Sequence, residues 1–197
     1  MGRCGPRVDC METATQPRVE FVSVEDYLDA EAGTEVRHEY LGGVVYAMAG
    51  ETREHNEIMQ NLAFSLRRHV LRGGCKLYLS DIKVNFEIRG DEYFYYPDLV
   101  VTCDKRDTDR LVLRYPKLII EVLSPSTERT DRREKFLAYT NIATLEEYAL
   151  VGQKPREVTV FRRTRDWKSE VIAGAKAKLT LSSLKLSVPL SAIYEGV

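Results

Sequence analysis

Two short apolar runs, each interrupted by a single carboxylate, constrain the fold of this chain more than any other feature. Residues 95–101 contain Asp98, and residues 118–123 contain Glu121. Short apolar runs that are rich in β-branched residues and bounded by Pro, Asp or Ser are typical of buried strands. A carboxylate is seldom fully buried unless its negative charge is compensated. The chain must therefore provide a cation, or strong hydrogen bonding, beside each of these strands.

A divalent cation shared by the two acids would provide that compensation, and oxygen ligands of this type suit Mg²⁺ or Mn²⁺. The alternatives are that Asp98 caps the turn after Pro97, or that either acid forms a buried salt bridge with an arginine. For one acid alone these alternatives are favoured. For the pair a metal site is favoured, because both acids interrupt core strands and not loops.

The length and composition indicate one domain with a substantial core. Of 197 residues, 44% are hydrophobic and 30% are charged, an ordinary balance for a globular protein. We expect a disordered tail over residues 1–19 and a single domain over residues 20–197. No apolar run reaches membrane-spanning length, so no membrane segment is expected. The formal net charge of −1 argues against a surface coated with nucleic acid but allows a local basic groove.

The four cysteines show no spacing typical of a zinc site. Cys75 and Cys103 border predicted strands, and we expect both to be reduced thiols in the core. The first residues lack the apolar core of a secretion signal. Together these features predict a cytoplasmic location.

Periodicity and turn residues predict an alternation of helices and strands. A helix should begin at Ser23 and end at Gly33, followed by a hairpin that turns at Gly42–Gly43. The longest helix should run from Thr52 to Arg72. A further helix is predicted over residues 130–141, and strands are predicted over residues 76–88 with a break at 80–81, and over 92–103, 116–123, 147–151, 157–163 and 167–172.

Three other residues are candidates for the same site as the two acids, and each also has a purely structural explanation. His55, in the first turn of the long helix, should be neutral and more often caps or packs than acts chemically. Glu39, from its pattern alone, reads as a solvent-facing strand residue. Lys135 lies on the same helix face as Phe136 and Tyr139, so its ammonium could approach Glu121; otherwise it snorkels to solvent or pairs with Asp131.

Two carboxylates at one edge of a sheet, with a lysine nearby, suit the hydrolysis of phosphodiester bonds. A bound divalent ion activates water and stabilises the charge that develops on phosphate, and the lysine adds a fixed positive charge. Other metal-assisted hydrolyses fit the spacing equally well.

Several segments resemble the PD-(D/E)XK nuclease superfamily and, more closely, the Uma-type restriction-endonuclease-like family. The most specific segment is residues 121–127, EVLSPST, followed by Asp131, residues 134–136 and Tyr139. Others are residues 37–41 with Gly43, 49–50 with 55–56, 80–81 with Lys83, 96–98, and 147–148 with 150–151. The resemblance extends from about residue 23 to residue 194. It implies an α/β (α+β) fold with a mixed central sheet flanked by helices, a magnesium-type site using Asp98, Glu121 and Glu39, and DNA as substrate.

One position departs from the superfamily's pattern, which places a lysine two residues after the second acid. Leu123 stands there in this chain, and leucine can neither orient water nor offset charge. The resemblance implies that Lys135 is a relocated substitute. Lys83 is a second candidate, and Asp81 and His55 are possible supporting residues.

The expected partner is DNA, which Arg129, Arg132 and Arg133 could contact in a groove beside the site, although charge runs are more often solvated faces. A homodimer is expected, because cutting both strands of a duplex needs two active sites. Two alternatives stay open: a non-catalytic relative that binds DNA or a protein, and a hydrolase of smaller phosphate esters.

Overall fold

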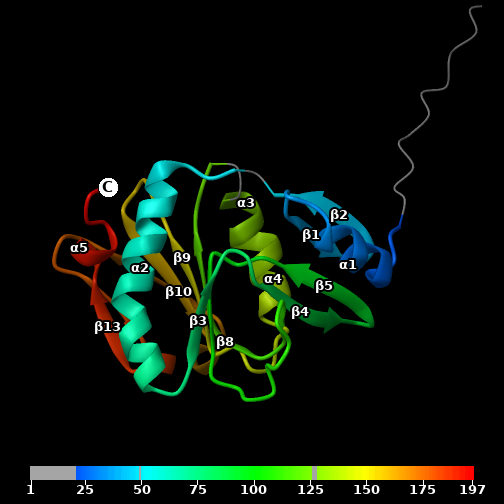
Figure 1. The fold of residues 1–197 in the computed structure, drawn as a ribbon. Helices are drawn as coiled ribbons and strands as arrows, with labels where there is room; N and C mark the ends of the chain where they lie inside the picture. Colours follow the sequence, from blue (N-terminus) through cyan, green and yellow to red (C-terminus); the bar gives the residue numbers. More distant parts are fainter. Residues whose placement is uncertain (1–20, 49, 126–127) are drawn as a thin grey trace, which may run out of the picture.

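The computed structural model describes residues 21–48, 50–125 and 128–197. The predicted tail over residues 1–19 lies outside the described residues. The chain forms a six-stranded sheet with helices on both faces and a five-stranded sheet beside it (Figure 1). This arrangement confirms the predicted mixed sheet flanked by helices.

The first described elements follow the sequence prediction closely. Helix α1 (Val24–Ala32) begins after Ser23, whose Oγ accepts a hydrogen bond from the Asp26 amide over 3.1 Å, and Gly33 caps its end. Strands β1 (His38–Leu41) and β2 (Val44–Ala47) form the expected antiparallel hairpin. Gly42 and Gly43 adopt φ angles of 55° and 101°, which glycine accepts without steric cost.

The six-stranded sheet has the order β11-β10-β9-β8-β6-β3. Strand β8 lies inside it and is antiparallel to β6 but parallel to β9, so the sheet is mixed. The strand bounds are β3 (Lys76–Leu79), β6 (Leu99–Thr102), β8 (Pro116–Val122), β9 (Glu147–Val151), β10 (Glu157–Arg162) and β11 (Ser169–Ala173).

Alternate residues of β8 enter the two cores on either side of this sheet, as the period of a strand requires. Leu118, Ile120 and Val122 pack with the apolar stripe of α2 (Arg53–Arg72). Ile119 and Leu123 face the opposite core, which α4 (Phe136–Tyr139) covers. Figure 1 shows α2 on one face and α3 and α4 on the other. Glu121 therefore projects toward the α4 side.

The five-stranded sheet has the order β2-β1-β5-β4-β7. Its remaining strands are β4 (Lys83–Ile88), β5 (Asp91–Tyr95) and the short β7 (Val112–Leu113). The prediction of one strand over residues 92–103 was wrong in one respect. The chain leaves this sheet after Tyr95 and enters the other at Leu99, so Asp98 lies between two strands. Pro97 lacks the N–H that a continuous ladder needs, which accounts for the interruption. The predicted break at Ser80–Asp81 is the matching crossing between β3 and β4.

The C-terminal elements complete the core on the α2 side. Strands β12 (Lys178–Leu181) and β13 (Leu186–Pro189) form a small antiparallel sheet, and the short helix α5 (Leu190–Ile193) follows. Their apolar residues join the same cluster as α2. Within the described ranges, no helix combines the length and the apolar character needed to cross a bilayer.

The prediction that Cys75 and Cys103 are reduced was wrong, because they form a disulfide. They lie next to the pairing of Lys76 with Thr102 in the antiparallel ladder of β3 and β6, and their Cα atoms are 4.1 Å apart. The alternation that identified both strands did not give their register, so the sequence did not show that these cysteines face each other. The cysteines consequently no longer support the predicted cytoplasmic location.

Candidate metal centre and active site

A cavity of about 450 Å³ lies among the β1–β2 hairpin, the start of α2, the end of β8 and the helical segment that begins at residue 128. Six acidic side chains line it, and His55 and Lys135 are the basic residues among its lining side chains. The acidic members are Glu39, Glu51, Asp98, Glu121, Asp131 and Glu134. A concave, acidic site of this kind attracts cations.

Asp98 is held against the end of β8 by its own backbone and side chain. Its amide donates to Glu121 Oε2 over 3.0 Å, and its Oδ2 accepts from the Val122 amide over 2.6 Å. The side chain is 11% exposed. The crossing of the chain between the two sheets therefore places Asp98 directly beside Glu121, as the sequence predicts.

Glu121 lies deeper than Asp98, with a side chain that is 3% exposed. The Tyr139 hydroxyl donates to its Oε1 over 3.1 Å. Burial raises the pKa of Glu121 well above its ordinary value; Lys135 lowers that pKa, while the charges of Asp98 and Asp131 raise it further. Binding of a proton or a cation would therefore stabilise this buried carboxylate.

Lys135 supplies a positive charge to this pocket. Its Nζ lies 2.9 Å from Glu39 Oε1, 3.4 Å from Glu121 Oε1 and 3.5 Å from Asp131 Oδ1. Burial alone would lower the pKa of Lys135, but the three carboxylates raise it well above its ordinary value. The predicted approach of Lys135 to Glu121 is confirmed, and so is its pairing with Asp131.

A π-helical turn carries Lys135 to this position. The predicted helix over residues 130–141 begins earlier, as α3 (Glu128–Thr130), and continues as a π-helix (Asp131–Lys135) before α4. A π turn adds a residue to one turn of the helix and so changes the direction of its side chains. Asp131 and Lys135 are both buried here.

Glu39 joins the pocket from β1 and does not face solvent as its pattern alone suggested. Its side chain is 13% exposed. The backbone amide of Tyr96 donates to its Oε1 over 3.4 Å, and Lys135 contacts the same oxygen. The expectation that came from the family resemblance, and not the pattern, matches its position.

His55 lies in the first turn of α2, between two carboxylates. Its Nε2 is 3.1 Å from Asp98 Oδ2, and its Nδ1 is 3.0 Å from Glu51 Oε2. Burial alone would lower the pKa of His55, but the hydrogen bond to Asp98 and the charges of Asp98 and Glu51 raise it to about 10. In this structure, the expectation of a neutral imidazole was wrong, because two nearby carboxylates outweigh the helix terminus.

Other predicted residues lie away from the cavity. Asp81 is 74% exposed and pairs with Arg37. Lys83 is buried, but its Nζ donates to the Tyr96 hydroxyl over 3.1 Å and not to the acids. Arg129 and Arg133 are exposed and Arg132 pairs with Glu128; none of the three lines the cavity.

Glu51, Asp131 and Tyr139 are site residues that the sequence did not assign to the centre. Glu51 precedes α2, and its spacing of four residues from His55 was an available signal. Both Asp131 and Tyr139 belong to the motif that carries the resemblance, but the only roles assigned to them were helix partner of Lys135 for Asp131 and core residue for Tyr139.

The donor set fits a divalent cation. Ligand atoms of Glu51, His55 and Asp98 all lie within 4.8 Å of one another, and further carboxylate oxygens from Glu39 and Glu121 line the same cavity. Carboxylate oxygens are the usual protein ligands of Mg²⁺ and Mn²⁺.

Residues 24–191 match the sequence profile of the Uma2 family, which is described as "Putative restriction endonuclease". The chain belongs to this family. The match includes Asp98, Glu121 and Lys135, and it confirms the resemblance inferred from the motifs.

Similar proteins agree with this assignment. An uncharacterized protein of Synechocystis, slr1290, is 35% identical over 89% of this chain and 93% of its own length. A second uncharacterized Synechocystis protein, sll1609, is 27% identical over 84% of this chain and 96% of its own length. A crystal structure described as a "putative nuclease" from Anabaena variabilis superimposes with a TM-score of 0.72 at 18% identity, covering 88% of this chain and 97% of that one. At this identity the superposition establishes the shared fold.

Proposed function

We propose that this protein is a metal-dependent endonuclease that hydrolyses phosphodiester bonds in DNA. The observation that carries the proposal is the meeting of Asp98, Glu121 and Lys135 in one cavity, from three separate segments of the chain. Membership of a family described as "Putative restriction endonuclease" supports the same reaction. The likeness to a structure described as a "putative nuclease" supports it in fold.

Asp98, Glu121 and Glu39 are proposed to hold Mg²⁺ or Mn²⁺. A divalent ion bound there would lower the pKa of a coordinated water and stabilise negative charge on the phosphate. The acidic lining itself would repel a DNA backbone, so the cation also makes the cavity able to accept phosphate.

Lys135 is proposed to supply the positive charge that the superfamily's motif lysine provides, since Leu123 occupies the motif position in this chain. Leu123 is 5% exposed and packs in the core under α4, so it cannot reach a substrate. The Lys135 ammonium holds Glu39 and Glu121 in place. It also leaves a fixed positive charge at the wall of the cavity, where it would stabilise a phosphate that gains charge.

DNA is the proposed partner, with the exposed Arg129 and Arg133, and Arg132 on the same helical segment, as phosphate contacts. A homodimer is proposed because cleavage of both strands requires two centres. The second candidate function is a non-catalytic module that binds DNA or protein, which the replacement of the motif lysine by Leu123 favours.

The decisive experiment measures cleavage of plasmid and linear DNA with Mg²⁺ or Mn²⁺ by the wild-type protein and by Asp98→Asn. We expect metal-dependent cleavage that the substitution abolishes while the thermal unfolding midpoint changes little. Asp81→Asn, an exposed acid outside the cavity, is the matched control and should cleave like the wild type.

Cleavage that persists in a clean Asp98→Asn preparation would refute the assignment. Absence of cleavage, together with a melting temperature that neither metal changes, would favour the binding module, since a bound metal must stabilise the folded state. If the protein cleaves a small phosphodiester but not polymeric DNA, the substrate is a small phosphate ester and not DNA.

A further inference from the structure

The start of α2 brings a nitrogen donor to the acidic cavity. The Thr52 side chain caps the helix by accepting a hydrogen bond from the His55 amide over 3.2 Å. This cap fixes the first turn, and the His55 ring enters the interior with 3% exposure. Ring nitrogens of histidine are common ligands of transition metals.

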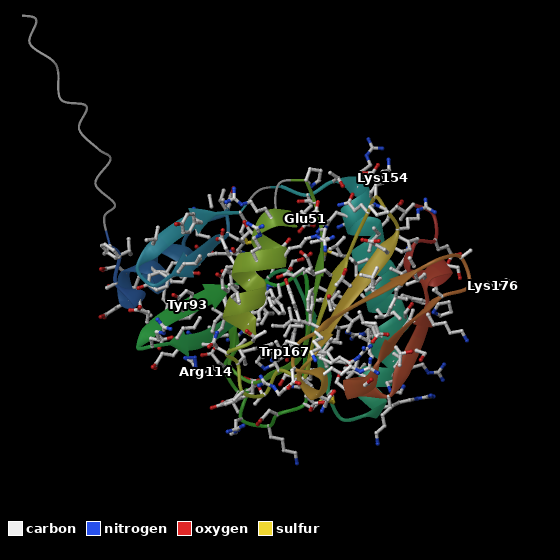
Figure 2. All side chains as sticks on the ribbon, turned by 180° about the vertical axis from the view of Figure 1, so that it is seen from behind. Glu51, Tyr93, Arg114, Lys154, Trp167 and Lys176 are labelled. Atoms are coloured by element: carbon white, nitrogen blue, oxygen red, sulfur yellow. A yellow bond between two sulfur atoms is a disulfide. The ribbon has the colours of Figure 1, made fainter. Side chains whose placement is uncertain are left out.

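Glu51 and Asp98 lie on either side of this ring. Their carboxylates are 3.0 Å and 3.1 Å from its two nitrogens. The buried Nδ1 makes no well-formed hydrogen bond within the described part of the chain, despite its closeness to Glu51. Figure 2 shows Glu51 next to the helical segment that carries Lys135, and both residues line the cavity.

The spacing of these three side chains suits a single ion. Their ligand atoms lie within 4.8 Å of one another, and no other group of three His, Cys, Asp or Glu residues in the described ranges meets that limit. Ligands bound at about 2.1 Å in octahedral geometry are separated by roughly 3 to 4.2 Å. Small rotations of the side chains, with release of the ring proton of His55 to solvent, would therefore bring all three to one cation.

The charge distribution in the cavity also favours a cation beside Glu51, His55 and Asp98. The Lys135 ammonium is 2.9 Å from Glu39 and 3.4 Å from Glu121, so that side already contains a cation. An ammonium weakens the attraction of the carboxylates it contacts for a second cation, whereas the carboxylates of Glu51 and Asp98 are paired with His55.

We propose that Glu51 and His55 are ligands of the divalent ion together with Asp98, and that the imidazole nitrogen makes the centre select Mn²⁺ over Mg²⁺. This inference rests on the proposed metal-dependent function and names residues and a metal preference that it does not contain. Mg²⁺ favours oxygen ligands, whereas imidazole suits transition metals, so the nitrogen is the source of the selectivity.

Pulsed electron paramagnetic resonance of Mn²⁺ bound to the full chain tests the ligand directly. We expect nitrogen modulation from one imidazole in the wild type, and a change in its frequency when histidine is labelled with ¹⁵N. The modulation should vanish in His55→Gln and persist in His69→Gln. His69 lies on the same helix but contacts the Leu184 carbonyl instead.

Calorimetric titration with Mn²⁺ and Mg²⁺ gives a second readout. Glu51→Gln and His55→Gln should each weaken Mn²⁺ binding by about tenfold or more, since even outer partners of a metal site have effects of this size. His55→Gln should weaken Mg²⁺ binding less. The ¹⁵N experiment on the wild type shows whether a histidine is bound even if His55→Gln does not fold, and His38→Gln and His69→Gln then test the other two histidines of the chain.

The possible failures can be distinguished. Mn²⁺ binding that Asp98→Asn abolishes, without nitrogen modulation in the wild type, would overturn the role of His55 and leave the proposed function standing. Equal affinities for Mn²⁺ and Mg²⁺ would overturn the selectivity. Absence of any metal binding would overturn both this inference and the proposed function.

Discussion

The Lys135 ammonium lies 3.4 Å from Glu121 Oε1, although the two residues are separated by 14 positions in the sequence. In the resembling superfamily the lysine follows the second acid on the same strand. Here a π-helical turn, packed over the end of β8, brings the same charge to the same carboxylate. In this chain, a residue 14 positions after Glu121 thus brings an ammonium to its carboxylate.

Replacing Lys135 with methionine should abolish cleavage and destabilise the metal-free protein. The change leaves the buried carboxylates of Glu39, Glu121 and Asp131 without their cation, and breaking a buried ion pair on one side costs about 3–5 kcal/mol. Urea unfolding in a chelator measures the loss. Lys176→Met, at an exposed site far from Glu51 in Figure 2, should change neither activity nor stability; a Lys135→Met protein that still cleaves would exclude Lys135 from the reaction.

Glu31 of α1 should be required to hold Glu39 in the cavity. Its carboxylate accepts hydrogen bonds from the His38 amide over 3.0 Å and from the Tyr96 hydroxyl over 2.8 Å. Glu31→Ala would leave these buried donors unpaired, which should lower the free energy of unfolding by about 1–3 kcal/mol. It should also weaken metal binding, because His38 precedes Glu39 and its displacement would move the Glu39 carboxylate.

Urea unfolding and calorimetric titration of the metal test this role, with the exposed Glu35→Ala as the control. Unchanged metal affinity in a folded Glu31→Ala protein would show that Glu31 only stabilises the fold.

The sequence was sufficient to predict most of the helices and strands and to identify the two central acids. Alternation in β8 and the helical period of α2 are strong local signals, and a carboxylate within an apolar strand marks Glu121. The boundaries set by Ser23 and Gly33 were also correct, because caps are encoded locally.

Features that depend on register or on contacts between distant segments could not be predicted. The crossing of the chain between sheets around Asp98 looked like one continuous strand, because both halves are apolar. Glu51 precedes its helix and gains significance only when α2 packs beside Asp98. The π turn that directs Lys135 lies in a segment for which the sequence pattern predicted one continuous helix.

The titration of Lys83 should increase the free energy of unfolding as the pH rises. Burial lowers the pKa of Lys83 below its ordinary 10.5, against the effect of Glu31. The folded state thus binds fewer protons than the unfolded state between the lowered pKa and 10.5, and the free energy of unfolding increases with pH there. Below the lowered pKa the penalty is fully present.

Comparison with Lys83→Met isolates this effect, because titration of other groups cancels in the difference. As the pH rises through the alkaline range toward 10.5, the wild type should gain free energy of unfolding relative to the variant in urea titrations. A constant difference across that range would show that Lys83 titrates normally.

The disulfide between Cys75 and Cys103 should stabilise the fold by restricting the unfolded chain. It closes a segment with a sequence separation of 28, for which loop-closure entropy gives about 3–4 kcal/mol. The double substitution Cys75→Ala with Cys103→Ala should lower the free energy of unfolding by that amount in oxidising buffer. With reductant, the wild type and the double variant should unfold at nearly the same urea concentration, because the reduced wild type has lost the same constraint. A wild type that reductant leaves unchanged, and that matches the variant in both buffers, would show that the two thiols stay reduced in solution.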